Sequence, residues 1–186
     1  MMTTTPVTNV SLAAFALTTA DLPTGFNIET SREKSADEVG TLAKDLGWQQ
    51  GYVTICSFPS NTTNSSSAIT QTITVYPKEK MSGIVSLINT NERQQTGMDF
   101  SDMQLPATGP DTFAFSAQVT NKTTEPATTE NSITWAPDTR ESAPGEGYFE
   151  VIFYKGEILE VIRVSGPGAH YDALKTLAET AYAKLD

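Results

Sequence analysis

Two strand-like segments near the C-terminus, separated by a turn of two residues, constrain the fold more than any other feature. Tyr148–Tyr154 and Glu157–Val164 have the residue pattern of strands, and Lys155-Gly156 lies between them. So short a connection joins antiparallel neighbours through a turn of the primed type. Apolar groups occupy both faces of Tyr148–Tyr154, so we expect helices to cover this part of the sheet on both sides.

Apolar residues at helical spacing predict three helices. The first begins at a capping box, Ser35 to Glu38, and Gly47 can end it in the left-handed conformation. Its buried stripe consists of Val39, Leu42, Ala43 and Leu46. Similar stripes predict a helix over about Lys78–Arg93 and a final helix that reaches Leu185.

Alternating residues predict further strands. A strand follows Leu22–Phe26, and Tyr52–Phe58 and Ile69–Tyr76 form a hairpin with a long polar tip. Phe113–Val119 is a strand, and Ile133–Trp135 is its expected short partner. The predicted class is therefore α+β, with a central antiparallel sheet flanked by helices.

Length and charge limit the domain organisation and the partners. We expect residues 1–19 to be an N-terminal tail or spacer and residues 20–186 to form a single α+β domain. The formal net charge is −10 and no cluster of Lys or Arg occurs, which argues against nucleic acid and against an anionic membrane surface as partners. With one cysteine, Cys56, the chain forms no internal disulfide.

Several features favour a location outside the cytoplasm. Threonine-rich runs and acceptor sequences for N-glycosylation occur in expected loops, at Asn61, Asn64 and Asn121. The opening residues, Met1–Pro6, resemble a start codon placed on a Thr/Pro spacer. We therefore expect an extracytoplasmic or cell-surface domain whose native leader was removed, with a membrane tether upstream.

The order of elements resembles the Mog1/PsbP-like fold group and the small extracytoplasmic lipoproteins similar to it. The matching features are the opening Leu22-Pro23-Thr24-Gly25-Phe26, the long central hairpin, and the closing hairpin and helix over Tyr148–Leu185. This resemblance in layout implies an α/β/α sandwich that acts as a binding or assembly module, in some members anchored by lipid. It carries no functional residue over to this sequence.

Candidate catalytic residues are few. His170 is the only histidine, and no Gly-x-Ser-x-Gly motif accompanies it. Cys56 has no Lys or Arg nearby in sequence, so a buried thiol is the expected role. Loop carboxylates could in principle gather as in a hydrolase, although their spacing fits no calcium loop and a solvated acidic rim is the simpler interpretation: Asp99, Asp102, Asp111, Glu141 and Glu146.

Aromatic residues give the remaining candidate site. Trp48, Tyr52 and Trp135 could line a ligand pocket or a partner surface, or pack in the core. The hypothesis that follows is a non-enzymatic extracytoplasmic domain, with no cofactor, that binds a protein or a small apolar ligand. The alternatives are a hydrolase that uses clustered carboxylates and a cytosolic assembly factor.

Overall fold

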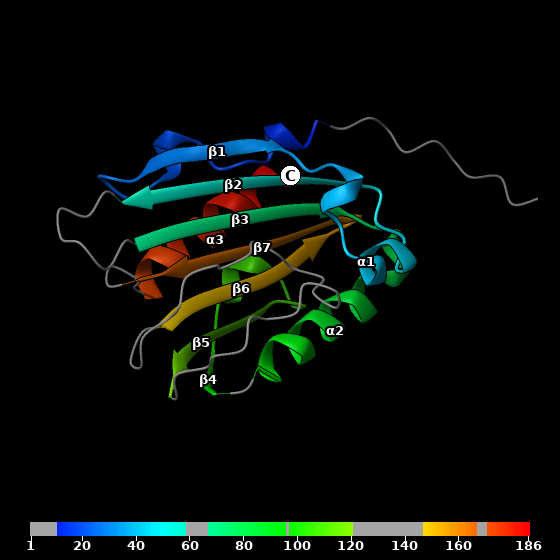
Figure 1. Ribbon diagram of the computed structural model, residues 1–186. Helices are drawn as coiled ribbons and strands as arrows, with labels where there is room; N and C mark the ends of the chain where they lie inside the picture. The colour runs from blue at the N-terminus through cyan, green and yellow to red at the C-terminus, as the bar shows by residue number, and fades with distance from the viewer. Residues whose placement is uncertain (1–10, 59–66, 96, 121–146, 167–170) are drawn as a thin grey trace, which may run out of the picture.

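A single seven-stranded antiparallel sheet organises the molecule (Figure 1). The computed structural model describes residues 11–58, 67–95, 97–120, 147–166 and 171–186. The strand order is β1-β2-β3-β7-β6-β5-β4, and each neighbouring pair is antiparallel. The strands are β1 (Asn27–Glu33), β2 (Gln50–Phe58), β3 (Ser67–Val75), β4 (Met98–Met103), β5 (Phe113–Val119), β6 (Gly147–Lys155) and β7 (Ile158–Ser165). The predicted α+β class and its central antiparallel sheet are confirmed.

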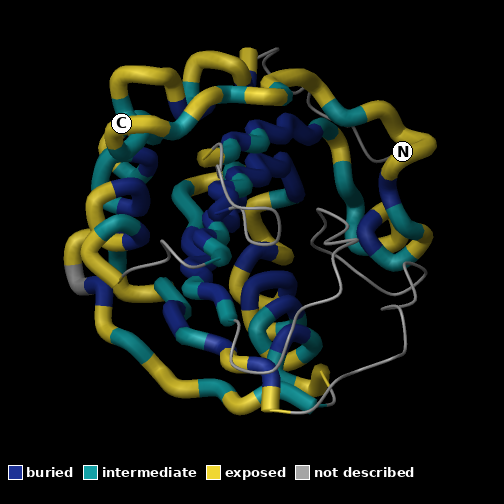
Figure 2. Tube along the Cα trace, turned by 60° about the vertical axis from the view of Figure 1, so that its left-hand side comes forward, coloured by how far each residue is buried: buried dark blue, intermediate teal, exposed yellow. Residues whose placement is uncertain are grey.

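Two long helices pack on opposite faces of the sheet. These are α2 (Met81–Arg93) and α3 (Tyr171–Lys184), and α3 lies behind the strands in Figure 1. Alternate residues of β6 separate accordingly, because Val151 and Phe153 join the core beneath α3 whereas Ile152 joins the core beneath α2. Buried residues therefore gather at the centre of the molecule, and exposed residues follow its outer turns (Figure 2).

The prediction of one continuous helix between Ser35 and Gly47 is wrong. The chain forms a 3₁₀ turn, η3 (Ala36–Glu38), and then a five-residue helix, α1 (Thr41–Asp45). Val39 between them has extended backbone angles, φ −108° and ψ 124°, and the glycine that follows has a low helix propensity. The Ser35 amide donates to the Glu38 carboxylate at 2.8 Å, as a capping box requires. Gly47 has φ +94°, which confirms the left-handed end.

The turn of the closing hairpin lies one residue later than predicted, which shifts the pairing of its two strands by two residues. Lys155 pairs with Ile158, so Gly156 and Glu157 are the two turn residues instead of Lys155 and Gly156. Gly156 has φ +64° and occupies the first central position, where primed turns require a positive φ. The backbone demand for glycine at that position thus decides the register of the whole hairpin.

Strand β4 was not predicted from the sequence. It forms one edge of the sheet and pairs with β5, and the polar residues Asp99, Ser101 and Asp102 obscure its alternation. The predicted partner strand Ile133–Trp135 lies outside the described residues.

The N-terminal segment packs against the sheet. It contains two 3₁₀ turns, η1 (Leu12–Ala14) and η2 (Thr19–Asp21), and two further 3₁₀ turns precede α2 and β5, namely η4 (Lys78–Lys80) and η5 (Pro106–Thr108). Leu12 and Leu17 are fully buried, and Leu12 belongs to a small cluster with Tyr52 and Ile73. Packing therefore begins before the boundary expected at residue 20.

We predict opposite effects for two glycine-to-alanine substitutions. Gly83 lies in α2 with open space around its missing side chain, so Gly83→Ala should raise the free energy of unfolding by about 0.5–1 kcal/mol. Gly47→Ala should lower it by about 1–2 kcal/mol, because alanine resists the positive φ. Urea unfolding of both variants measures the effects, and equal changes of one sign would contradict this description of the backbone.

Candidate functional site

The structure separates the aromatic residues proposed as one surface. Trp48 packs beside the core beneath α2, whereas Tyr52 is 8% exposed and packs with the N-terminal segment on the opposite face. The Tyr52 hydroxyl is 3.0 Å from the hydroxyl of Ser31. Trp135 lies outside the described residues, as do the glycosylation candidates Asn61, Asn64 and Asn121. Trp48 is thus the described aromatic candidate that faces α2.

Cys56 lies in the core and has the properties expected of a structural thiol. It is fully buried, and burial together with the charge of Glu29 raises the pKa of its thiol to about 11. A thiol so far from its thiolate form is a poor nucleophile at neutral pH. His170, the other candidate for nucleophilic chemistry, lies outside the described residues.

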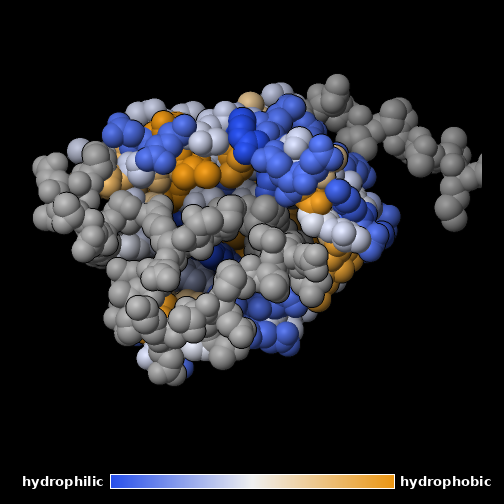
Figure 3. Space-filling view, viewed as in Figure 1, coloured by the Kyte–Doolittle hydropathy of each residue, from blue (hydrophilic) through white to orange (hydrophobic). Residues whose placement is uncertain are grey.

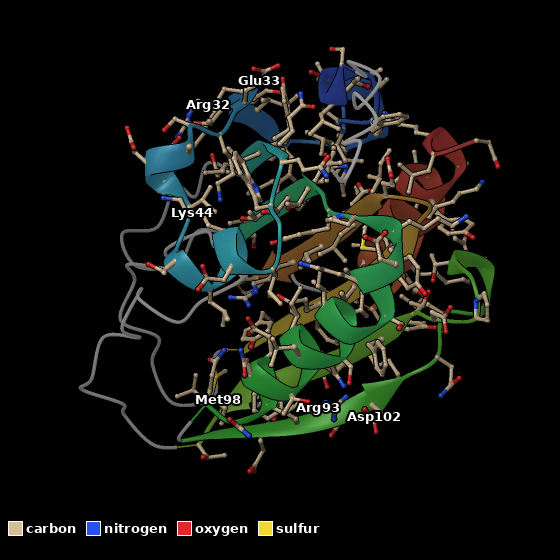
Figure 4. The ribbon with its side chains drawn as sticks, turned by 90° about the vertical axis from the view of Figure 1, so that its right-hand side faces the viewer. Arg32, Glu33, Lys44, Arg93, Met98 and Asp102 are labelled. Atoms are coloured by element: carbon tan, nitrogen blue, oxygen red, sulfur yellow. The ribbon has the colours of Figure 1, made fainter. Side chains whose placement is uncertain are left out.

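The described carboxylates among the hydrolase candidates lie in separate places. Asp102 forms an ion pair with Arg93 of α2, and Figure 4 shows the two side chains together. Asp111 accepts a hydrogen bond of 3.1 Å from the Tyr154 hydroxyl, and alternation along β4 directs Asp99 to the face opposite Asp102. Glu141 and Glu146 lie outside the described residues. Within the described part of the chain, no group of three potential metal-ligating side chains occurs.

An ionic cluster, buried between α2 and the sheet, is the most unusual chemical feature of the described residues. It consists of Glu92, Tyr148, Glu150 and Arg163, and we call it the Arg163 cluster. The Arg163 Nε donates to Glu150 Oε2 at 2.6 Å, and another guanidinium nitrogen donates to Glu92 Oε2 at 3.0 Å. The guanidinium carbon lies 4.1 Å from the centre of the Tyr148 ring. The arrangement combines charge-assisted hydrogen bonds with a cation–π contact.

Burial shifts the ionisation of this cluster. It raises the pKa of Glu150 to about 7, against the opposing charge of Arg163. Although burial alone would lower it, the carboxylates of Glu150 and Glu92 raise the pKa of Arg163, so the guanidinium stays charged. Glu150 Oε1 is buried and accepts no hydrogen bond from the described residues, which leaves an acceptor unused by them beside the Arg163 cation.

Beside this cluster, the sheet presents a strip of mixed apolar and hydroxyl side chains. Register places Thr30, Ile55, Thr70 and Arg163 in one row across β1, β2, β3 and β7. The next row, Val53 and Thr72, lies beside Val161 of the core beneath α2, so both rows share that face. We call Thr30, Val53, Ile55, Thr70 and Thr72 the β2–β3 strip.

The β2–β3 strip is partly open to solvent. Ile55 and Thr70 are half-buried, whereas Val53 and Thr72 are buried. The face that carries α2 is toward the viewer in Figure 3, where hydrophobic atoms lie over β2 beside hydrophilic ones. Trp48 packs over Gly51 at one end of β2, because its indole nitrogen lies 3.2 Å from where a side chain at Gly51 would begin. The strip therefore lies between an indole ring and a charged cluster.

The Arg163 cluster was missed from the sequence because of the predicted hairpin register. A turn at Lys155-Gly156 pairs Glu150 with Val161, whereas the observed turn pairs Glu150 with Arg163. Opposite charges that face each other across neighbouring strands are a recognisable stabilising pair. The correct placement of Gly156 in the turn would have been enough to predict it.

Comparisons with known proteins support the fold. Neither a protein-family model nor a curated protein matches the sequence. The structure is similar to the crystal structure of the extracellular domain of PknH from Mycobacterium tuberculosis, with a TM-score of 0.63 and 12% sequence identity, over 97% of this chain and 98% of that chain. At this identity the likeness establishes the fold alone, so the chain shares its architecture with a domain that lies outside the cell. No described helix is long and apolar enough to cross a membrane.

Proposed function

We propose that this chain is a non-catalytic extracytoplasmic domain that binds a small, mainly apolar ligand on the β2–β3 strip. The observation that carries the proposal is that Ile55 and Thr70, which are half-buried, lie in one row with Arg163 of the cluster. Ligand sites combine apolar walls with a few fixed polar groups that orient the ligand. Here Ile55 and the threonine methyl groups supply the apolar surface, and Arg163 supplies the fixed polar group.

The absence of catalysis is part of the proposal, and the state of the candidate catalytic groups supports it. The Cys56 thiol is buried with a raised pKa, and the carboxylates Asp102 and Asp111 are engaged by Arg93 and Tyr154. In each case the group has a structural partner or environment that explains it without a reaction.

The proposed location outside the cytoplasm draws on sequence and fold together. The threonine-rich segments and the acceptor sequences at Asn61, Asn64 and Asn121 suit an exposed extracytoplasmic surface. The likeness to an extracellular domain points the same way. Membership of the Mog1/PsbP-like group is a proposal, which the antiparallel sheet between two helices supports. A lipid tether is a further proposal, and it rests on the resemblance to that group, some of whose members are anchored by lipid.

Binding of an uncharged apolar dye, Nile red, tests the proposed site. Ile55→Asp places a charge on the strip and should weaken binding on the order of tenfold or more, because an ionised group resists burial beside an apolar ligand. Ile158→Asp is the matched control, since Ile158 is also half-buried but belongs to the cluster on the opposite face. Equal affinities of the two variants would exclude the strip, and failure of the wild type to bind would exclude an apolar ligand in favour of a protein partner.

A further inference from the structure

The N-terminal segment, residues 11–21, is held to the sheet by a buried glutamine. The backbone amide of Leu17 donates to the Gln71 side-chain oxygen at 2.7 Å. The Gln71 side-chain nitrogen donates in turn to the Phe15 carbonyl at 3.2 Å. Leu12 and Leu17 add to this attachment, because their side chains are fully buried. A single side chain of β3 therefore fixes two backbone positions of the segment.

The same glutamine binds a buried acid. The Gln71 side-chain nitrogen also donates to Glu160 Oε1, and Glu160 is fully buried. Within the described part of the chain, Glu160 Oε2 and the hydroxyl of Thr54 have no hydrogen-bond partner. Thr54 pairs with Gln71 across β2 and β3. A carboxylate in such surroundings lacks the solvation that its charge requires.

Among the described residues, Lys184 is the charged group that acts on Glu160. It also holds the N-terminal segment. Lys184 Nζ donates to the Ala16 carbonyl at 2.9 Å and to Asp21 Oδ2 at 2.6 Å. The strands on either side present uncharged residues, since Ile73 of β3 and Phe153 of β6 pair with Glu160. The described ammonium group that acts on the buried acid therefore binds the N-terminal segment.

We propose that the N-terminal segment is a strap whose seating on the sheet is controlled by the protonation state of the Glu160 carboxyl group. When Glu160 carries its proton, Lys184 stays on Ala16 and Asp21, and the strap is seated. When Glu160 loses the proton, the buried charge requires Lys184 or water. Either response weakens the strap, because Lys184 leaves its two acceptors or water enters beneath Leu17.

Electrostatics place this change near neutral pH. Burial raises the pKa of Glu160 to about 8, against the opposing hydrogen bond from Gln71 and the charge of Lys184. The ordinary value is 4.5, so the seated strap is fully favoured below pH 4.5 and loses this contribution as the pH rises toward 8. Asp21 does not titrate in this range, because hydrogen bonds from Lys184 and Thr18 outweigh its partial burial and lower its pKa below 3.8.

Hydrogen exchange of the Leu17 amide, followed by NMR at pH 6 to 9, tests the proposal. We expect protection, corrected for the intrinsic exchange rate, to fall by up to about tenfold per pH unit between pH 6 and 7.5 and to level off above pH 8. Glu160→Gln keeps the shape and the hydrogen bond but cannot ionise, so its Leu17 protection should not vary with pH. The same fall in the variant, or no fall in the wild type, would overturn the proposal.

Two controls distinguish strap release from other events. The amide of Val151, in the central strand β6, should keep its protection while that of Leu17 falls, and a parallel fall of both would mean global unfolding and refute the strap. This comparison uses the wild type, so it remains decisive if Glu160→Gln fails to fold. Glu150→Gln removes the buried acid on the opposite face and should leave the Leu17 profile unchanged. If Glu150→Gln abolished the pH dependence of Leu17 protection, that dependence would come from Glu150 instead of Glu160, and the proposal would be overturned.

Discussion

Arg163→Met is expected to lower the free energy of unfolding by about 3–5 kcal/mol at pH 7.5. The substitution removes the cation from two acids whose side chains are only 1% and 9% exposed, Glu150 and Glu92. It also removes the cation–π contact with Tyr148. The pKa of Glu150 is about 7, so its carboxyl group is mostly ionised at pH 7.5 and mostly protonated at pH 5. The loss of unfolding free energy should therefore shrink as the pH falls toward 5. Urea unfolding at both pH values measures it.

Arg93→Met is the matched control for that prediction. Arg93 also pairs with an acid on the α2 face and lies 5.2 Å from the centre of an aromatic ring, that of Phe115. Its partner Asp102, however, is 72% exposed, so water solvates the carboxylate after the arginine is lost. The expected cost is about 0–1 kcal/mol. Similar costs for the two arginines would mean that burial does not set the strength of the Arg163 cluster.

Leu17→Ala should cost about 2–5 kcal/mol of unfolding free energy at pH 6, where the strap is seated. Leu17 is 1% exposed and belongs to the main core beneath α3, with Phe153 and Leu177. Its truncation leaves a cavity between the N-terminal segment and the sheet. Thermal or urea unfolding gives the value directly.

The control for Leu17 lies two residues further along the chain. Thr19 is exposed, and Thr19→Ala should change the unfolding free energy by less than about 0.5 kcal/mol. If Leu17→Ala were equally harmless, the segment before residue 20 would behave as the tail that the sequence alone suggests, and the strap would have no energetic basis.

Periodicity was enough to predict the main elements of this fold. Helices α2 and α3 and strands β2, β3 and β5–β7 carry stripes or alternation that hold over several turns or residues. The failures are local. A single extended residue, Val39, divides the first helix. The placement of Gly156 moves the last turn by one residue and the pairing of its strands by two.

The buried polar groups were much harder to predict. Glu150 and Arg163 lie opposite each other only in the observed register, so the predicted pairing, which was shifted by two residues, hid this contact. Gln71 and Glu160 come from strands far apart in the sequence and point into the core at positions where an apolar residue is the usual choice. No short-range pattern connects them with Leu17 or Lys184. Only the tertiary arrangement brings these groups together.

The functional account depends on a domain that works outside the cytoplasm. Membrane-impermeant biotinylation of surface lysines, performed on intact cells that express the protein from its full natural reading frame, tests this most directly. The account predicts labelling of the protein on intact cells, to nearly the level reached after lysis. Labelling only after lysis, as for a cytosolic control protein in the same cells, would contradict it and favour the cytosolic assembly factor.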